Sequence, residues 1–483
     1  MIVSAPQSAV NIAGAKSVIR RGLLRLLREP VPRKRPSLDR VAAPGYALPT
    51  FVRSCPVAMR YLDLLGQVPW SDFPERPMDR PWPGPRPESR APFAAAYLVK
   101  IDQGLRYMSD VRAYLVELPA LVWILGFKLV ADPAARHGFD VEASVPSRRQ
   151  LGRVLRELAR SQVEWLLDGS VRALADAVPE ELLGDTVSLD TKHILAWVKE
   201  NNPKAYVRAR FDPERQPAGD PDCRLGCKRR ANTPPVEPMP ASEAGRAEFC
   251  WGYASGVVAT QLRDGTEIVL AELTQTFDKH DVTYFEPLMA ETERRLGRRP
   301  RYGALDAAFD AFYVYDHFDQ AGGFAAVPFV ARGGVAARRF DTDGNPVCEA
   351  SEAMTLERTF IDRTSFVEHE RGVWTCPLIG NAERCPVDHA KWTKGGCRVT
   401  MATAPGARLR HQLDREGGDY KAVYKQRTAT ERINSQATEL GIERPRLRNQ
   451  AAIANHNALL YALIDLRALR RTREKQADRR LAA

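Results

Sequence analysis

A tyrosine, an arginine and a glutamate follow one another at three- and four-residue spacing in the stretch "DYKAVYKQRTATERIN". On a helix of about 3.6 residues per turn, Tyr424, Arg427 and Glu431 lie along one face. One interpretation is a solvated face with an Arg–Glu pair, which contributes only about 0.2–0.5 kcal/mol. The other is a site in which the carboxylate binds a metal ion, and that interpretation requires further carboxylates elsewhere in the chain.

Two aspartates stand where short strands are predicted to end. Asp190 closes the β-branched run "TVSLD", and Asp306 closes "YGALD". A carboxylate at the end of a buried strand loses hydration and needs a compensating partner. For either aspartate alone, capping of the following turn is the simpler explanation, because Asp commonly begins turns. Together with Glu431 they form an oxygen-rich set suited to Mg²⁺ or Mn²⁺.

The segments "TVSLDTKHI", "YGALDAAFDAF" and "YKQRTATERIN" resemble the three acidic motifs of the DDE transposases of bacterial insertion sequences. The third motif fits the branch that carries Y-x2-R-x3-E, and the resemblance covers roughly residues 184 to 465. It implies that Asp190, Asp306 and Glu431 are the catalytic triad and hold two Mg²⁺ or Mn²⁺ ions. Arg427 is then expected to hold a phosphate or orient Glu431, and Tyr424 to contact the DNA backbone.

The resemblance also implies a fold and an activity. The fold is an α/β, RNase H-like mixed-sheet core with a β-rich insertion, preceded by a helical N-terminal region. The activity is two-metal phosphodiester hydrolysis and transesterification on double-stranded DNA, at the transposon ends and at the target, by a homodimer or larger assembly. The sequence departs from the branch at Thr438, where a Lys or Arg is usual, and at Ala254, where the Gly-Tyr-Lys after the first acid is usual. These departures affect expected DNA contacts and leave the metal site intact.

Two other functions remain open. A catalytically inactive, transposase-derived DNA-binding protein would have no physical reason to keep three costly clustered carboxylates. An RNase H-like nuclease without transposition fits the core, but it does not explain the large insertion or the basic N-terminal region. A cleavage assay with Mg²⁺ on DNA carrying candidate terminal repeats separates these functions.

A second cluster of candidate ligands lies in the insertion, in "CPLIGNAERCPVDHAKWTKGGC". Cys376, Cys385, His389 and Cys397 are soft or borderline ligands, which zinc accepts. Their spacing differs from the paired C-x2-C pattern of most structural zinc sites, so buried free thiols are the competing interpretation.

Hydrophobic periodicity indicates which elements position these residues. Apolar residues at three- and four-residue spacing predict helices before residue 184, with Ser147 near one helix start. From Thr186 onward the pattern predicts a strand, a hairpin joined at "RDGT", a helix with Asp281 as its N-cap, and then a strand, turn and helix. Asp310 is expected to cap that last helix rather than to bind metal. Strand and helix thus alternate in a mixed α/β order.

These changes of texture divide the sequence into six parts. The prolines of residues 69–92 rule out a continuous helix or a central strand there. Residues 16–35 carry eight Lys/Arg and one acid, so this stretch is strongly basic. The parts are a basic N-terminal arm (1–68), a Pro-rich linker (69–92), a helical DNA-binding domain (93–183), the first part of the RNase H-like core (184–332), the insertion (333–415), and the last part of the core with a C-terminal basic helix (416–483).

Composition limits the class of protein. The 483 residues are 44% hydrophobic, enough for a sizeable core, and the formal net charge of +11 favours a polyanionic partner, foremost nucleic acid. The longest apolar stretch, residues 120–127, is far shorter than the roughly 20 residues of a membrane span, so no membrane partner is expected. With neither a secretory signal nor a dense disulfide framework, we expect a cytoplasmic, nucleoid-associated bacterial protein.

Overall fold

The computed structural model describes residues 36–76, 88–178, 183–229, 247–331, 337–387 and 396–482. Residues 1–35 of the predicted basic arm and 77–87 of the Pro-rich linker therefore lie outside the described residues. The chain divides into two compact units, Met1–Leu166 and Leu167–Ala483. The candidate site lies wholly in the second unit.

The first unit is helical, and from α5 onward this is as the periodicity of the sequence predicts, whereas α2, α3 and α4 lie in the stretch assigned to the basic arm, where no helix was predicted. Helix α5 (Ala91–Asp102) is buried on nearly all sides, which is typical of a central helix. Ser147 is the N-cap of α9 and accepts a hydrogen bond from the Gln150 backbone N–H at 3.2 Å, so the predicted helix start is confirmed. The remaining helices are α2 (Leu38–Ala42), α3 (Thr50–Arg53), α4 (Pro56–Leu65), α6 (Met108–Glu117), α7 (Pro119–Leu125), α8 (Val141–Ser144) and α9 (Arg148–Glu157), with a small hairpin of β1 (Val130–Ala131) and β2 (Phe139–Asp140). Helix α10 (Arg160–Ala177) leads into the second unit.

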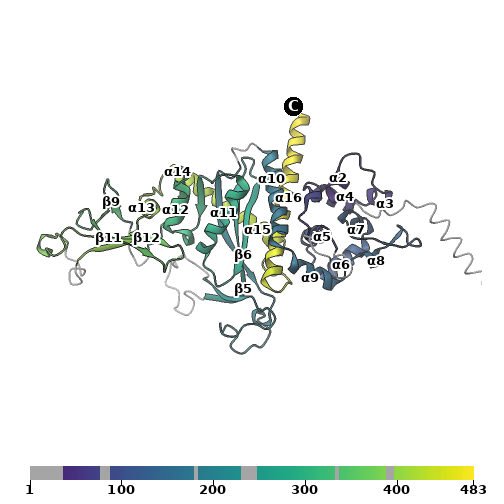
Figure 1. Cartoon of the computed structure of the whole chain (residues 1–483), viewed down its shortest axis with the longest axis horizontal. Coiled ribbons are helices and arrows are strands. Elements are labelled where there is room, and N and C mark those ends of the chain that lie inside the picture. Colours follow the sequence, from purple (N-terminus) through teal and green to yellow (C-terminus); the bar gives the residue numbers. More distant parts are fainter. Residues whose placement is uncertain are drawn as a thin grey trace, which may run out of the picture. The chain divides into compact units, whose positions relative to one another are not determined.

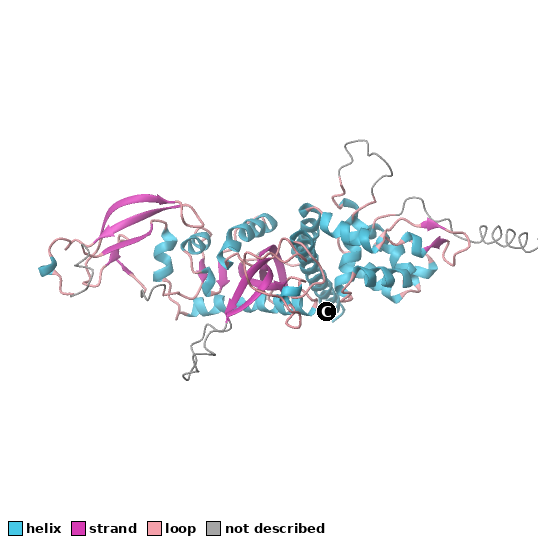
Figure 2. Ribbon diagram, turned by 90° about the horizontal axis from the view of Figure 1, so that it is seen from below, coloured by secondary structure: helices cyan, strands magenta, loops and turns pink. Residues whose placement is uncertain are grey.

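A mixed sheet organises the second unit (Figure 2). Its strands are β3 (Thr186–Leu195), β4 (Arg224–Arg229), β5 (Ala247–Gln261), β6 (Glu267–Thr276), β7 (Tyr302–Leu305) and β8 (Phe324–Ala326). The order is β6-β5-β3-β7-β8, and β4 continues along β5 beyond the end of β6. The first three strands are antiparallel, whereas β7 and β8 run parallel to β3. This is the arrangement expected of an RNase H-like core, and the predicted fold class is confirmed.

Helices cover both faces of this sheet (Figure 1). The contacts of two consecutive residues of β5 show which helix lies on which face. A Cβ on Gly256 would lie 2.4 Å from the Tyr284 ring, just before α11 (Phe285–Leu296), so that backbone approaches too closely for any side chain. The hydroxyl of the preceding Ser255 instead contacts the Tyr461 hydroxyl of α16 at 3.5 Å. Because successive residues of a strand face opposite ways, α11 and α16 lie on opposite faces. The same reasoning at β7 places α12 (Phe312–Asp319) on the α11 face and α14 (Gly418–Tyr424) on the other.

The last helix, α16 (Gln450–Ala482), lies along the antiparallel half of the sheet. Its residues from Leu459 to Leu469 are buried except Arg467, so this part of the helix belongs to the core. Two polar contacts fix it to β6: the Val269 N–H donates to Asp465 at 2.8 Å, and Asn457 donates to Thr274 at 2.8 Å. The buried carboxyl of Asp465 also accepts a hydrogen bond from Ser170 on α10 at 3.2 Å. Burial raises the pKa of Asp465 to about 8.

The insertion between β8 and α14 contains its own β structure, as predicted. Two short strands, β9 (Arg339–Phe340) and β10 (Pro346–Val347), precede an antiparallel sheet of β11 (Thr355–Asp362), β12 (His369–Thr375) and β13 (Arg398–Ala402). Helix α13 (Pro405–Gln412) returns the chain to the core, where Arg410 forms a two-pronged ion pair with buried Asp310 at 2.5 and 2.7 Å. The prediction that Asp310 caps a helix is therefore wrong, because Ala311 is the N-cap of α12 and the Asp310 carboxylate is occupied by Arg410, Tyr315 and Val330.

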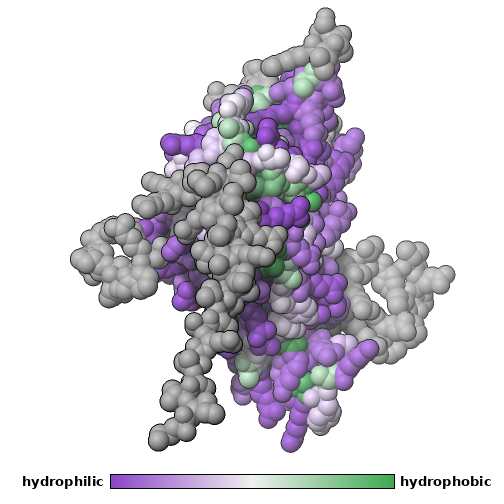
Figure 3. All heavy atoms as spheres, turned by 90° about the vertical axis from the view of Figure 1, so that its right-hand side faces the viewer, coloured by the Kyte–Doolittle hydropathy of each residue, from purple (hydrophilic) through white to green (hydrophobic). Residues whose placement is uncertain are grey.

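The surface is polar where it can be seen. On the face drawn in Figure 3 hydrophilic side chains predominate, and the hydrophobic patches not covered by grey atoms are small and separate. No helix in the described ranges is long and apolar enough to cross a membrane.

Candidate active site

Asp190 and Asp306 are neighbours on two parallel strands. Leu189 of β3 pairs in register with Leu305 of β7, so the next residue of each chain segment is an aspartate. Asp306 follows the last residue of β7 and caps a short 3₁₀ turn by accepting from the Ala308 N–H at 2.9 Å. Asp190 does not end its strand as predicted, because β3 continues antiparallel to β5 as far as Leu195. Asp190 is instead the first residue of β3 beyond its pairing with β7, while β3 stays paired with β5 on its other side.

The Asp190 carboxylate lies in a crowded, partly desolvated position. It accepts hydrogen bonds from the Thr191 N–H at 2.9 Å and from Nδ2 of Asn434 at 3.0 Å. Burial, together with the negative charge of nearby Asp306, raises the pKa of Asp190 to about 6. Burial likewise raises the pKa of Asp306. The site therefore favours a positive charge between these two carboxylates.

Asp281 is a third acid at this position, and it lies outside the predicted site. The expectation that Asp281 is a helix N-cap is wrong: His280 precedes the 3₁₀ turn at 281–284, and no side chain caps it. The Asp281 carboxylate instead accepts from the Thr191 hydroxyl at 2.8 Å. Its charge adds to the effect of burial in raising the pKa of both Asp190 and Asp306. No spacing in the sequence links it to the other acids, because only the path of the chain after β6 brings it to them.

Tyr424, Arg427 and Glu431 lie together on a helical run, as predicted, although a 3₁₀ turn at 425–427 separates α14 from α15 (Thr428–Glu439). Nη2 of Arg427 lies 2.5 Å from Oε1 of Glu431, and the guanidinium lies 5.8 Å from the centre of the Tyr424 ring. The Glu431 side chain is 46% exposed. Arg427 also lowers the pKa of Asp190 and of Asp306, although burial outweighs it at both. The helix thus brings a cation and a carboxylate toward the two strand aspartates.

One open cleft of about 1080 Å³ is lined by all three predicted catalytic residues. Asp281, Asn434 and Thr438 line it as well, and three lysines contribute to its walls, namely Lys192, Lys228 and Lys279. Glu431 faces this cleft while paired with Arg427. Among the described residues, no three His, Cys, Asp or Glu side chains stand in an arrangement that could hold a metal ion. The structure therefore gathers the triad around one cleft without closing it into a ligand set.

The residues present nevertheless fit a hard divalent cation. Asn434 is 7% exposed, and its Oδ1 has no hydrogen-bond partner although its Nδ2 donates to Asp190. A buried carbonyl oxygen without a partner costs about 1–3 kcal/mol, and amide and carboxylate oxygens are the ligands that Mg²⁺ and Mn²⁺ prefer. The unpaired Oδ1 of Asn434, whose amide Nδ2 donates to Asp190, and the two carboxylates with raised pKa values are donors that such an ion would satisfy.

The predicted zinc ligands are described only in part. Cys376 and Cys397 are buried in a small apolar cluster of the insertion, and Cys385 is half-buried nearby in sequence. His389 lies outside the described residues. All three cysteines are free thiols.

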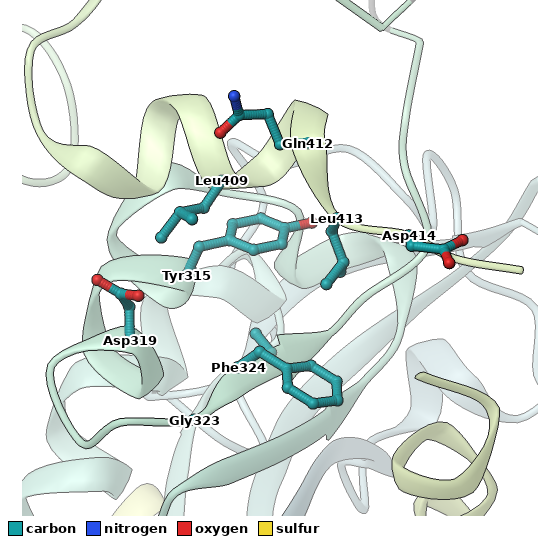
Figure 4. A pocket seen from close by; sticks show the side chains of 9 residues that line it. Tyr315, Asp319, Gly323, Phe324, Leu409, Gln412, Leu413 and Asp414 are labelled. Carbon is teal, nitrogen blue, oxygen red and sulfur yellow. The ribbon is translucent and has the colours of Figure 1, made fainter. Parts of the chain in front are cut away.

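A second, smaller cavity of about 250 Å³ lies between α12, α13 and β8. Figure 4 shows Tyr315, Leu409 and Leu413 around it, while the carboxylates of Asp319 and Asp414 lie at its margin. Its lining is mainly apolar, and none of the triad contributes to it. It has no part in the chemistry considered for the larger cleft.

Comparison with known proteins adds little to this geometry. No protein-family model matches the chain, and no curated protein matches it. A solved structure, the Mos1 transposase paired-end complex with left transposon end, aligns with 63% of this chain and 76% of its own at 14% identity. The TM-score of this alignment is 0.15, too low to carry an argument about fold or function. The RNase H-like arrangement rests on the strand order and directions described above.

Proposed function

We propose that this protein is a DNA transposase of an insertion sequence, which binds terminal inverted repeats and catalyses metal-dependent strand cleavage and strand transfer. The observation that carries the proposal is the register of β3 and β7, which sets Asp190 beside Asp306 on a cleft that Glu431 also lines. Buried carboxylates near one another raise the free energy of the apo fold, and a function that needs them explains their presence.

Each residue has a chemical task in this proposal. Asp190, Asp306 and Glu431 would hold divalent cations, and Oδ1 of Asn434 would add an uncharged ligand. When bound, such cations supply activation of the attacking oxygen and stabilisation of the leaving oxygen of a phosphodiester. Arg427 would exchange its pairing with Glu431 for a DNA phosphate, which frees the carboxylate to turn to the metal. Tyr424, beneath that guanidinium, would contact the backbone.

Cationic side chains in the cleft and outside it support a polyanionic substrate once metal ions offset the acids. Lys192, Lys228 and Lys279 line the cleft together with seven Asp and Glu residues, and outside its lining the guanidinium groups of Arg446 and Arg448 lie 5.6 and 4.8 Å from the Trp197 ring. Lysine and arginine side chains make most contacts to DNA phosphates, which position the duplex without reading its sequence. Since transposition joins two element ends, we propose that the active form is a homodimer or a larger assembly.

The test is a cleavage assay on duplex DNA that carries the inverted repeats flanking the reading frame. Wild-type protein should nick or cut at the repeat boundary with Mg²⁺ or Mn²⁺ and stay inactive with EDTA. Asp190→Asn, Asp306→Asn and Glu431→Gln should each lose at least about a thousandfold in rate, because each removes several kcal/mol of transition-state stabilisation. Asp319→Asn, at the margin of the other cavity, is the matched control and should keep the wild-type rate.

The alternatives give different results in the same assay. Repeat-specific binding without cleavage under any metal would indicate a transposase-derived DNA-binding protein. Cleavage of DNA without strand joining, and without preference for the repeats, would indicate an RNase H-like nuclease. Full activity in all three triad variants, with folding unchanged, would exclude the site.

A further inference from the structure

The three-stranded sheet of the insertion has too small an apolar core to be stable by itself. Among the residues that the structure describes, its buried cluster consists of five side chains with three partly buried ones against them: Met354, Trp374, Cys376, Cys397 and Val399, with Cys348, Leu378 and Met401. Strand β11 is exposed along nearly its whole length. Folded units this small usually depend on a metal, a disulfide or a partner, because they bury too little apolar surface. Two of the five core residues are cysteines, and cysteines can stabilise a small fold by binding a metal ion or by forming a disulfide.

These two cysteines are held face to face by the sheet. Cys376 directly follows β12 and Cys397 directly precedes β13, which is the antiparallel neighbour of β12. The Cys376 N–H donates to the Cys397 carbonyl at 3.0 Å. The ends of two paired strands therefore present two thiols to the same side of the cluster.

A third thiol comes from a segment that the sequence did not connect with them. Cys348 follows β10 and packs against the same cluster, and its backbone N–H donates to the Glu352 carbonyl at 2.9 Å in a tight turn. Cys385 approaches from the loop between β12 and β13, just after a short 3₁₀ turn at 382–384. Burial raises the pKa of the Cys376 thiol, and the neighbouring Cys348 and Cys385 raise it further. Cys348, Cys376 and Cys397 thus share one cluster of the small sheet, and Cys385 lies near enough to act on the charge of Cys376.

We propose that Cys348, Cys376, Cys385 and Cys397 bind one structural Zn²⁺ ion in the insertion. Tetrahedral zinc accepts four thiolates at about 2.3 Å, and each thiol releases its proton to solvent on binding. In this proposal Cys348 is the fourth zinc ligand, in place of His389, which was predicted from the sequence. In the described residues no three ligands are already closed around one point, so binding would draw the strand ends and the two loops together. This proposal is independent of the proposed transposase activity.

Zinc content of the full-length chain tests the proposal directly. Protein purified under reducing conditions and dialysed against metal-free buffer should retain about one Zn²⁺ per chain, released when the thiols are modified with an organomercurial. Cys348→Ser should lower the retained zinc at least tenfold, whereas His389→Ala should retain it. Cys55→Ser alters a half-buried free cysteine of the first unit and is the matched control.

A second variant covers the case in which Cys348→Ser fails to fold. Cys348→His keeps a zinc ligand, so it should still bind Co²⁺ in place of Zn²⁺, with weaker sulfur-to-cobalt charge-transfer absorption than the wild type. Three results would overturn the proposal: no zinc or cobalt bound by the wild-type chain, zinc retained by Cys348→Ser but lost by His389→Ala, or a Cys348–Cys376 disulfide found in the reduced preparation.

Discussion

At the scale of single residues, the site is defined by carboxylates kept close together at a cost. Asp190 is flanked by Asp306 and Asp281, and burial raises its pKa to about 6. Arg427 and two hydrogen-bond donors, the Thr191 N–H and the Asn434 amide, partly offset this crowding at Asp190. A folded-state pKa above the ordinary value means that the apo fold loses stability between about pH 4 and pH 6 and stays destabilised above that range.

We therefore expect Asp190→Asn to stabilise the metal-free protein while abolishing cleavage. The shift of about two pKa units corresponds to at most about 3 kcal/mol at pH 7.5. The new amide still accepts from Thr191, and rotation of the Asn434 amide would give its unpaired Oδ1 a donor. Thermal unfolding with and without Mg²⁺ measures this: Mg²⁺ should stabilise the wild type and not the variant. A variant less stable than wild type in EDTA would contradict the expectation.

Arg427 should set the acid limit of the reaction. Its charge lowers the pKa of Asp190 and of Asp306, so Arg427→Met should raise both values. Because both carboxylates must be ionised to bind metal, the acid limb of the cleavage rate should move to higher pH. The rate is measured between pH 5 and 9 at saturating DNA. Arg432→Met, on the same helix but paired with Glu267, is the control and should leave the limb in place.

At the scale of elements, the parallel pair β3 and β7 and the helical run α14–α15 position the site, and α16 supports the sheet behind it. The support depends on one buried acid. Asp465 of α16 accepts from the Val269 N–H and from Ser170, and burial raises its pKa to about 8. It therefore joins helix to sheet most favourably while it carries its proton.

This arrangement predicts a pH-dependent stability. Between about pH 4 and pH 8 the folded state holds a proton that the unfolded state has released, so stability should fall as pH rises and level off above pH 8. Asp465→Asn keeps an acceptor for Val269 and cannot ionise, so its unfolding free energy should lack this decline. Urea unfolding at pH 6, 7, 8 and 9 compares the two proteins. Parallel pH profiles would show that Asp465 is not the responsible group.

At the scale of the whole molecule, the net charge of +11 favours a polyanionic partner, whereas the cleft itself carries seven acids and three lysines and needs cations to accept one. Each phosphate contact made by a Lys or Arg releases counterions, so the affinity for duplex DNA should fall steeply with salt. The eight Lys and Arg residues between positions 16 and 35 are outside the described residues. That they bind DNA phosphates is a prediction from the sequence alone.

Removing residues 1–35 should therefore make DNA binding less salt-dependent. The slope of log affinity against log salt should become shallower by up to about seven, at about 0.9 per lost contact. Removing residues 1–15 takes away no Lys or Arg and is the matched control, with an unchanged slope. The measurement is fluorescence anisotropy on a repeat duplex at 50 to 300 mM salt. Equal slopes for both truncations would exclude the arm from the interface.

The sequence by itself determined the order of strands and helices, the β-rich insertion and the helical N-terminal unit, because hydrophobic periodicity is a local property of the chain. It also named Asp190, Asp306 and Glu431, which do line one cleft, although their role as metal ligands stays a prediction. Tyr424, Arg427 and Glu431 were predictable as a group, since the geometry of a helix fixes which residues share a face.

Only the tertiary structure decided which distant residues join them. Asp281, Asn434 and Cys348 reach their clusters through the register of β3 with β7, the path of the chain after β6 and the packing of the insertion. Asp310 was misassigned for the same reason, because its partner Arg410 is 100 residues away. Contacts between segments far apart in sequence depend on strand pairing and packing, and no local spacing encodes them.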